Sequence, residues 1–109
     1  MPKHEFGIMD QNPVTGQRFD QYEPQRYHCI AVDDDIILPR LERLTDFPFY
    51  WHTTDVLGNG LAYCGITLLS PEMSQNVENV IRNIPELYPL SNLLKQAIRD
   101  QKFVIHFGI

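Results

Sequence analysis

The stretch Leu61-Ala-Tyr-Cys-Gly-Ile-Thr-Leu-Leu-Ser-Pro-Glu72 predicts a buried strand that leads directly into a helix. Its first nine residues are almost continuously apolar, as in a strand from the interior of a sheet. Ser70 then supplies a capping hydroxyl, and Pro71 suits the first position of a helix. Apolar residues recur at helical spacing over residues 73–84 and again over 90–98. We therefore predict a strand followed by two consecutive helices.

Four further runs rich in apolar, β-branched and aromatic residues have the length of strands, at residues 3–9, 27–35, 49–56 and 102–109. Residues 36–46 have helical spacing. From residue 27 onward the order is therefore strand, helix, strand, strand, helix pair, strand. This order predicts one α+β domain over residues 1–109, a ferredoxin-like split β-α-β-β-α-β sandwich with helices on one face of the sheet. We expect the strands at 27–33 and 61–69 at its centre, and the extra N-terminal strand at an edge.

Two loops connect these elements. Leu57-Gly-Asn-Gly60 has the composition of a hairpin turn between the third and fourth strands. Residues 10–26 are polar and contain Pro13, Gly16 and Pro24. A loop of this length in a compact domain is usually functional or covers another part of the molecule.

Composition excludes some functions. The 109 residues are 43% hydrophobic and carry a net charge of −5, which disfavours nucleic-acid binding. The longest uncharged apolar stretch is far shorter than the ~20 residues of a membrane span. Without a secretory signal pattern, we expect a cytoplasmic protein with no membrane partner. Cys29 and Cys64 have no metal or disulfide-framework spacing, so we interpret both as buried free thiols.

The alternation of side chains along strands predicts one open face of the sheet. We place Ile30, Ile66 and Ile105, each in its own strand, toward the helices. The residues next to each of them in the strand then point toward the open face. The parity of the strand around Tyr50 is ambiguous, and we choose Trp51 as its helix-facing residue. The candidate ligand-binding residues on the open face are Tyr27, Asp33, Tyr50, His52, Tyr63, Thr67 and His106. Loop 10–26, a second copy of the chain or a ligand could cover this face.

Asp33-Asp34-Asp35 allows two interpretations. Three carboxylates suit Mg²⁺ or Ca²⁺, which makes Asp33, Asp34 and Asp35 weak metal candidates. We prefer the alternative that they begin the following helix, whose free N–H groups and dipole favour acids. The sequence therefore predicts no metal and no cofactor.

The histidines could take part in acid–base chemistry. His52 could pair with Asp55, and His106 with Asp33, if the strands bring them together. A histidine on a half-buried strand is more often simply hydrogen-bonded in place. No phosphate-binding loop, nucleophile elbow or zinc spacing is present, and no catalytic residue is assigned.

Five segments together resemble a family of small uncharacterised bacterial proteins of about this length. They are residues 4–9, 32–35, 50–52, 61–67 and 103–108, with Tyr50-Trp-His52 and Phe103-Val-Ile-His-Phe-Gly108 among them. The resemblance implies a single intact domain in a bacterial, cytoplasmic setting. The family has no assigned activity, so no site residue follows from it.

Three functional hypotheses remain open. The leading one is a non-catalytic, acidic binding or regulatory protein that engages a partner protein or a small ligand, or self-associates, through the open sheet face. The alternative is a small enzyme or metal-dependent ligand binder that uses His52, His106 and the Asp33–Asp35 cluster. The third is single-stranded nucleic-acid binding by Tyr27 and Tyr63, against which the charge argues.

Overall fold

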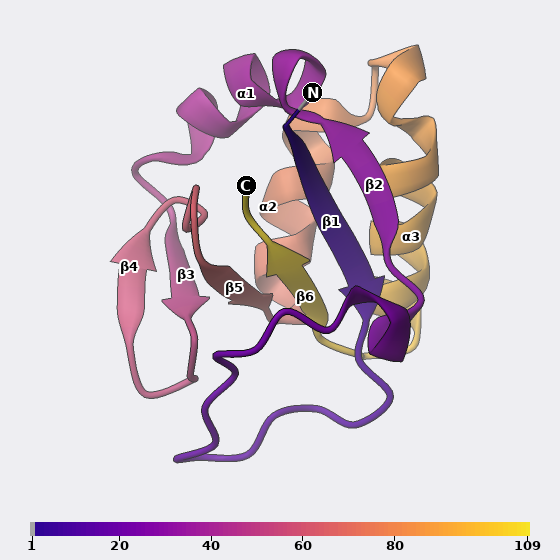
Figure 1. Cartoon of the computed structure of the whole chain (residues 1–109). Coiled ribbons are helices and arrows are strands. Elements are labelled where there is room, and N and C mark those ends of the chain that lie inside the picture. The colour runs from indigo at the N-terminus through magenta and orange to yellow at the C-terminus, as the bar shows by residue number, and fades with distance from the viewer. Residues whose placement is uncertain (1) are drawn as a thin grey trace.

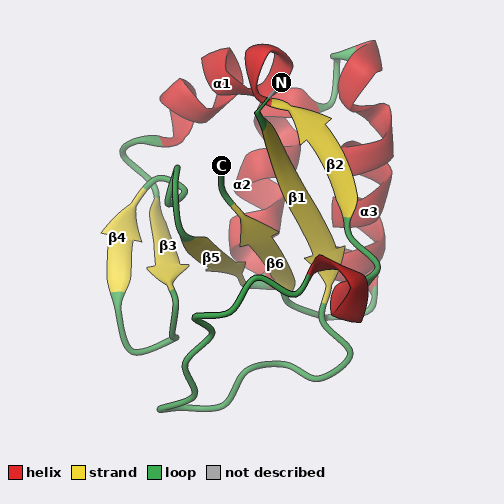
Figure 2. Ribbon diagram, viewed as in Figure 1, coloured by secondary structure: helices red, strands yellow, loops and turns green. Residues whose placement is uncertain are grey.

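The computed structural model describes residues 2–109, which form an α+β fold with six strands and three α-helices (Figure 1, Figure 2). In chain order these are β1 (Lys3–Ile8), β2 (Ile30–Asp33), α1 (Asp34–Leu41), β3 (Pro48–Trp51), β4 (Leu57–Asn59), β5 (Ile66–Leu69), α2 (Pro71–Ile81), α3 (Tyr88–Arg99) and β6 (Val104–Phe107). Short 3₁₀ turns lie at Pro24–Tyr27, Glu42–Leu44 and Pro85–Leu87. As predicted, the Ser70 hydroxyl caps α2 by accepting a hydrogen bond from the Met73 amide. Among the described helices, none has the length and apolar character to cross a bilayer.

The strands form one open antiparallel sheet in the order β2-β1-β6-β5-β3-β4. The α+β class is confirmed, but the ferredoxin-like order is not, because β1 lies between β2 and β6. The expected positions of the first two strands were wrong: β1 is internal and β2 is an edge strand. Tyr27 belongs to a 3₁₀ turn, so β2 keeps only four residues, and such a short strand suits an edge.

The expected hairpin turn at residues 57–60 is also wrong. Leu57–Asn59 is strand β4 itself, and it pairs with β3 so that Gly58 lies opposite Phe49. The reversal of the chain occurs earlier, where the Val56 amide donates to the Thr53 carbonyl.

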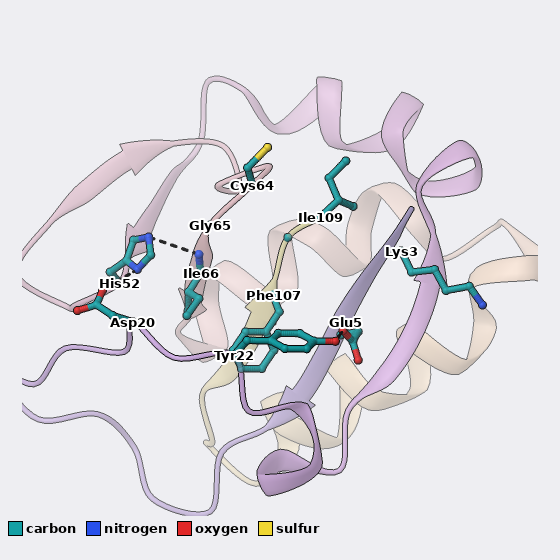
Figure 3. Close-up of a pocket in the computed structure, with 11 residues that line it drawn as sticks. Lys3, Glu5, Asp20, Tyr22, His52, Cys64, Gly65, Ile66, Phe107 and Ile109 are labelled. Carbon is teal, nitrogen blue, oxygen red and sulfur yellow. Dashed lines mark hydrogen bonds and ion pairs between the residues drawn. The ribbon is translucent and has the colours of Figure 1, made fainter. Parts of the chain in front are cut away.

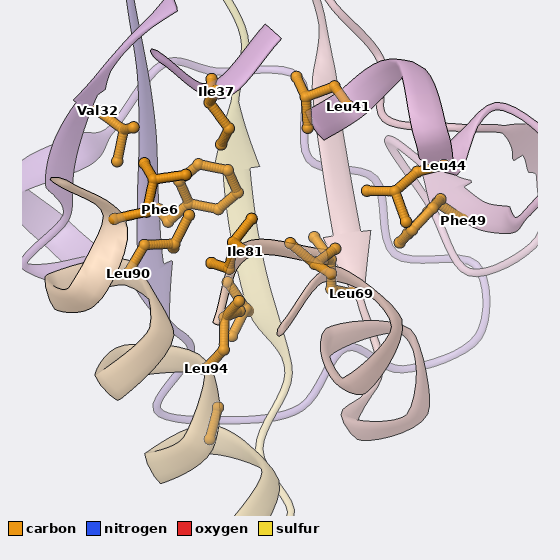
Figure 4. Close-up of a cluster of buried hydrophobic side chains, with 14 residues drawn as sticks. Phe6, Val32, Ile37, Leu41, Leu44, Phe49, Leu69, Ile81, Leu90 and Leu94 are labelled. Atoms are coloured by element: carbon orange, nitrogen blue, oxygen red, sulfur yellow. The ribbon is translucent and has the colours of Figure 1, made fainter. Parts of the chain in front are cut away.

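The main core lies between one face of the sheet and the helices (Figure 4). Apolar side chains from α1, α2 and α3 pack there against Phe6 of β1, Leu69 of β5 and Val104 of β6. We call this side of the sheet the helix face.

Loop 10–26 lies along the opposite side, which we call the loop face (Figure 1). Its buried Phe19, with Met9 and Tyr27 at its two ends, packs on a second apolar cluster formed by Ile66, Leu68, Ile105 and Phe107. Gly7 permits this close cover, since a Cβ there would lie 2.6 Å from the Tyr27 carbonyl oxygen. The loop is therefore one cover of the face that sequence analysis left open.

The two faces explain which strand orientations were predicted correctly. Val32 and Phe49 face the helices as expected. The orientation of β5 and β6 was wrong, since Ile66 and Ile105 belong to the loop face. Both faces of these two strands are covered, so apolar residues occur at both parities and alternation does not distinguish them.

Candidate functional site

The predicted site residues do not share one face. Tyr27 is buried on the loop face and Tyr50 packs against the same apolar cluster, whereas Thr67 and His106 are fully buried on the helix face. Asp33 ends β2 and lies 3.9 Å from the Lys3 ammonium. His52 follows β3, and Tyr63 precedes β5. Four of the seven predicted residues belong to two polar clusters on opposite sides of the sheet: Tyr63, Thr67 and His106 to one, and His52 to the other. Tyr27, Asp33 and Tyr50 belong to neither cluster.

The first cluster is a chain of hydrogen bonds that we call the helix-face network. It comprises Tyr63, Asp34, His4, His106 and Thr67. The Tyr63 hydroxyl donates to Asp34 Oδ2 at 2.7 Å, and His4 Nε2 lies 2.8 Å from Asp34 Oδ1. His4 Nδ1 lies 2.8 Å from His106 Nε2, and His106 Nδ1 lies 3.2 Å from Thr67 Oγ1. Both histidines are completely buried.

One arrangement of protons satisfies every atom in this network. An ionised carboxylate only accepts, so His4 Nε2–H donates to Asp34. Neutral His4 then accepts from His106 Nε2–H, which leaves His106 Nδ1 to accept the Thr67 hydroxyl proton. Thr67 Oγ1 in turn accepts the Ala62 amide at 2.8 Å. The network is thus fully paired when both imidazoles are neutral.

The neighbours of these groups shift their pKa values. Hydrogen bonds from His4 and then Tyr63 lower the pKa of Asp34 below its usual 3.8. The Asp34 hydrogen bond in turn raises the pKa of Tyr63 to about 12. Burial, and secondarily His4, hold the pKa of His106 well below its usual 6.5. Asp34 is therefore the anion of the network, and His106 is neutral.

Sequence analysis missed His4 and did not distinguish Asp34 from Asp33 and Asp35, which it treated together as weak metal candidates or as the start of a helix. Neither predicted pair forms a hydrogen bond within residues 2–109: His106 is bonded to His4, and His52 to a different aspartate. Of the three successive acids, only Asp34 is buried. They do begin α1, but Asp33, at the N-cap, makes no side-chain capping bond. Residues 2–109 contain no group of three or more His, Cys, Asp or Glu placed to hold a metal ion.

The second cluster lines a pocket of about 510 Å³ on the loop face (Figure 3). We call it the loop-face pocket. Its lining includes Glu5 from β1, Asp20 and Tyr22 from loop 10–26, and His52 after β3. Ile66 of β5 and Phe107 of β6 contribute apolar surface. It thus combines apolar surface with a few polar groups, as ligand pockets do.

His52 connects the loop to the sheet. Its backbone has φ 64°, a left-handed conformation that is uncommon outside glycine but less so for histidine. Its ring Nε2 lies 3.5 Å from the Ile66 amide, which is a donor, so Nδ1 carries the proton. Nδ1 is 3.1 Å from the Phe19 carbonyl oxygen and 3.0 Å from Asp20 Oδ1. Asp20 also accepts from Arg18, whose hydrogen bond lowers the pKa of this carboxyl.

Tyr22 connects the loop to β1. Its hydroxyl donates to Glu5 Oε1, and its ring contacts the Phe107 ring edge to face at 5.3 Å. The Tyr22 side chain is otherwise largely exposed. It therefore forms a wall of the pocket that is attached to the sheet through one carboxylate.

The two cysteines are free, as predicted, but they differ in exposure. Cys29 is half-buried, and burial raises the pKa of its thiol to about 12. Cys64 is exposed and lines the loop-face pocket, so the expectation that it is buried was wrong. In Figure 3 its sulfur points away from His52, so the two side chains do not form a nucleophile–base pair.

Comparison with known proteins yields no match to a protein-family model, a curated protein or a solved structure.

Proposed function

We propose that the protein is a non-catalytic binding protein whose loop-face pocket receives an arginine side chain from a partner protein. The observation that carries this proposal is the pocket itself, whose walls include Glu5, Asp20 and Tyr22 and whose volume is about 510 Å³. Pockets of some 300–1,000 Å³ commonly hold small ligands or anchoring side chains. We place this function in the bacterial cytoplasm, as the sequence resemblance implies.

The charges of the pocket favour a basic group. Glu5 and Asp20 contribute carboxylates, of which that of Asp20 is already bonded to Arg18 and His52. The protein as a whole has a net charge of −5. Lys3 is the pocket's lysine, and its ammonium is directed toward Asp33 at 3.9 Å. Long-range attraction would therefore bring a basic partner toward this acidic protein.

The shape of arginine fits the remaining surfaces. A guanidinium can bind carboxylates in a planar fork and can also lie against an aromatic ring, here that of Tyr22. The methylene stem of the same side chain would contact Ile66 and Phe107. Lysine offers the charge without the planar geometry, and we expect it to bind more weakly.

The separation of the histidines favours binding over catalysis. The enzyme hypothesis needs His52 and His106 in one cleft. His106 is completely buried within the helix-face network, and His52 lies beside the loop-face pocket. Nor do Tyr27 and Tyr63, proposed to stack nucleic-acid bases, occupy strands: Tyr27 is buried in a 3₁₀ turn, and Tyr63 lies in the turn before β5.

The first test is an NMR titration of the ¹⁵N-labelled protein with N-acetyl-arginine amide. We expect amide shifts at Glu5, Asp20, Tyr22 and His52, and much smaller ones with the uncharged analogue N-acetyl-citrulline amide. Absence of shifts, or shifts confined to another surface, would overturn the proposal.

A pair of variants isolates the charge of the pocket. Glu5→Gln retains an acceptor for the Tyr22 hydroxyl but removes the charge, and we expect about tenfold weaker binding. Glu86→Gln makes the same change on the exposed turn before α3, outside the pocket, and should leave the affinity unchanged. Equal effects of the two variants would mean that arginine responds only to net charge.

A further inference from the structure

The helix-face network joins two neighbouring strands at the centre of the sheet. His4 comes from β1 and His106 from β6, and these strands pair so that Phe6 lies opposite His106. The two imidazoles are hydrogen-bonded at 2.8 Å and are completely buried. No water can therefore take over a hydrogen bond that the pair loses while the strands stay together.

The network has no place for an additional proton without loss of a hydrogen bond. If the histidine pair gained one proton, His106 Nδ1 would become a donor to Thr67 Oγ1. That oxygen already accepts the Ala62 amide, so the Thr67 hydroxyl proton would lose its acceptor. A second added proton would place two N–H groups opposite each other across 2.8 Å.

The groups that face the histidine pair come from four elements. α1 contributes the Asp34 carboxylate to His4, and the segment before β5 contributes Tyr63, whose ring centre is 5.4 Å from that of His4. The neutral Thr67 hydroxyl and Phe6 ring contact His106 from β5 and β1. Within residues 2–109, the carboxylate bonded to the pair thus faces His4, and His106 is hydrogen-bonded to no carboxylate.

We propose that the His4–His106 pair is an acid-sensitive latch, which holds β1 against β6 when both imidazoles are neutral and releases them on acidification. The consequence for ligands rests on the proposed function. Lys3 and Glu5 flank His4 along β1, and Phe107 follows His106 along β6; all three line the loop-face pocket on the other side of the sheet. Opening of the latch would therefore dismantle the pocket and release its ligand.

The expected pH dependence follows from proton uptake. In the unfolded chain His106 binds a proton near its usual pKa of 6.5, whereas burial holds the pKa of the folded state well below that value. Below about pH 6.5 the unfolded chain therefore binds one more proton at this position, and folding becomes less favourable as pH falls. The unfolding equilibrium constant should rise about tenfold between pH 7.5 and 5.5 from this group alone.

Urea unfolding of the ligand-free protein at pH 7.5, 6.5 and 5.5 tests the latch. His106→Gln cannot titrate but can still donate a hydrogen bond toward His4. Between pH 7.5 and 5.5 we expect its unfolding equilibrium constant to rise about ten times less than that of the wild-type protein. His52→Gln changes a histidine outside the network, and its unfolding equilibrium constant should rise as much as that of the wild type. Equal pH dependence in wild type and His106→Gln would overturn the proposal.

A measurement on the wild-type protein tests the latch even if the His106→Gln variant does not fold. Imidazole NMR should show His106 as the neutral Nε2–H tautomer, without titration from pH 7.5 to 5.5 in the folded state. Titration of His106 near pH 6.5 would refute the latch. Binding of N-acetyl-arginine amide at pH 7.5 is a separate measurement. If the amide does not bind, the proposed function is wrong but the latch stands. If stability has the same pH dependence with and without His106, the latch is wrong but the proposed function stands.

Discussion

The helix-face network and the loop-face pocket use the same types of residue on opposite sides of one sheet. Each contains an aspartate bonded to a histidine ring, and each has a tyrosine that donates to a carboxylate. They differ in exposure. His4 and His106 are completely buried, whereas the side chains of His52 and Asp20 are 32% and 51% exposed. The two clusters therefore contain the same chemical groups but differ in how far solvent can reach them.

This difference decides what each cluster can do. A buried polar group that loses its partner costs free energy because water cannot replace the hydrogen bond. An exposed group rebinds water, so its contacts add little to stability and can be exchanged for those of a ligand. We therefore expect the loss of a hydrogen bond to cost more stability in the helix-face network than at the loop-face pocket, where we propose that a ligand binds.

The largest expected effect is that of His106→Leu. Leucine has a similar size, but His4 Nδ1 would lose its donor and the Thr67 hydroxyl its acceptor. Each unsatisfied group costs about 1–3 kcal/mol, partly offset by the apolar side chain, so we expect a loss of about 2 kcal/mol. Urea unfolding at pH 7.5 measures this loss.

The matched control is His52→Leu at the pocket. His52 is partly exposed, and its ring makes two contacts with backbone groups, with the Phe19 carbonyl oxygen at 3.1 Å and with the Ile66 amide at 3.5 Å, which is long for a hydrogen bond. We expect a loss below about 1 kcal/mol. If the two variants lose the same stability, the contrast between the clusters is wrong.

A smaller effect is expected from Gly65→Ala, whose added Cβ would meet mainly the His52 ring and, at 3.3 Å, the Ala62 Cβ. A Cβ at this position would lie 2.9 Å from His52 Nε2, the end of a side chain that can move aside. The displaced ring would lose its contacts with Ile66 and Asp20, and we expect a stability change within about 1 kcal/mol. The binding of N-acetyl-arginine amide, measured by NMR, should weaken.

A double variant checks the cause. In a His52→Ala background the ring is gone, so Gly65→Ala should have no further effect on binding. An equal effect of Gly65→Ala with and without the His52 ring would show that the substitution acts through the backbone instead.

The sequence carried enough information for the fold class but not for the strand order. The start of α2 was predictable because Ser70 and Pro71 act locally, through one hydroxyl and one fixed backbone angle. The position of β1 depends on which strands pair across long stretches of chain. Apolar content cannot determine this pairing, since an internal strand and a covered edge strand can have similar composition.

The candidate site was predictable in its residue types more than in its geometry. His52 and His106 were both singled out from the sequence, but their separation follows from the orientation of β6, which alternation predicted wrongly because loop 10–26 covers the second face. The partnership of His4 with Asp34 joins residues 30 positions apart. A buried histidine needs such a partner, and this requirement is the one signal that could have directed attention to the acids after residue 32.

The smallest expected effects are changes of carboxyl pKa, and they test whether the two clusters are independent. Arg18→Gln should raise the pKa of Asp20 toward 3.8, because the Arg18 hydrogen bond is the main cause of its lowering. Tyr63→Phe should raise the pKa of Asp34 by removing one of its two hydrogen bonds, while that from His4 remains. Side-chain ¹³C NMR titration measures both carboxyls. We expect each variant to move only its own aspartate, since none of the bonds described above joins the two clusters; a shift of both carboxyls in either variant would mean that the clusters are coupled through the sheet.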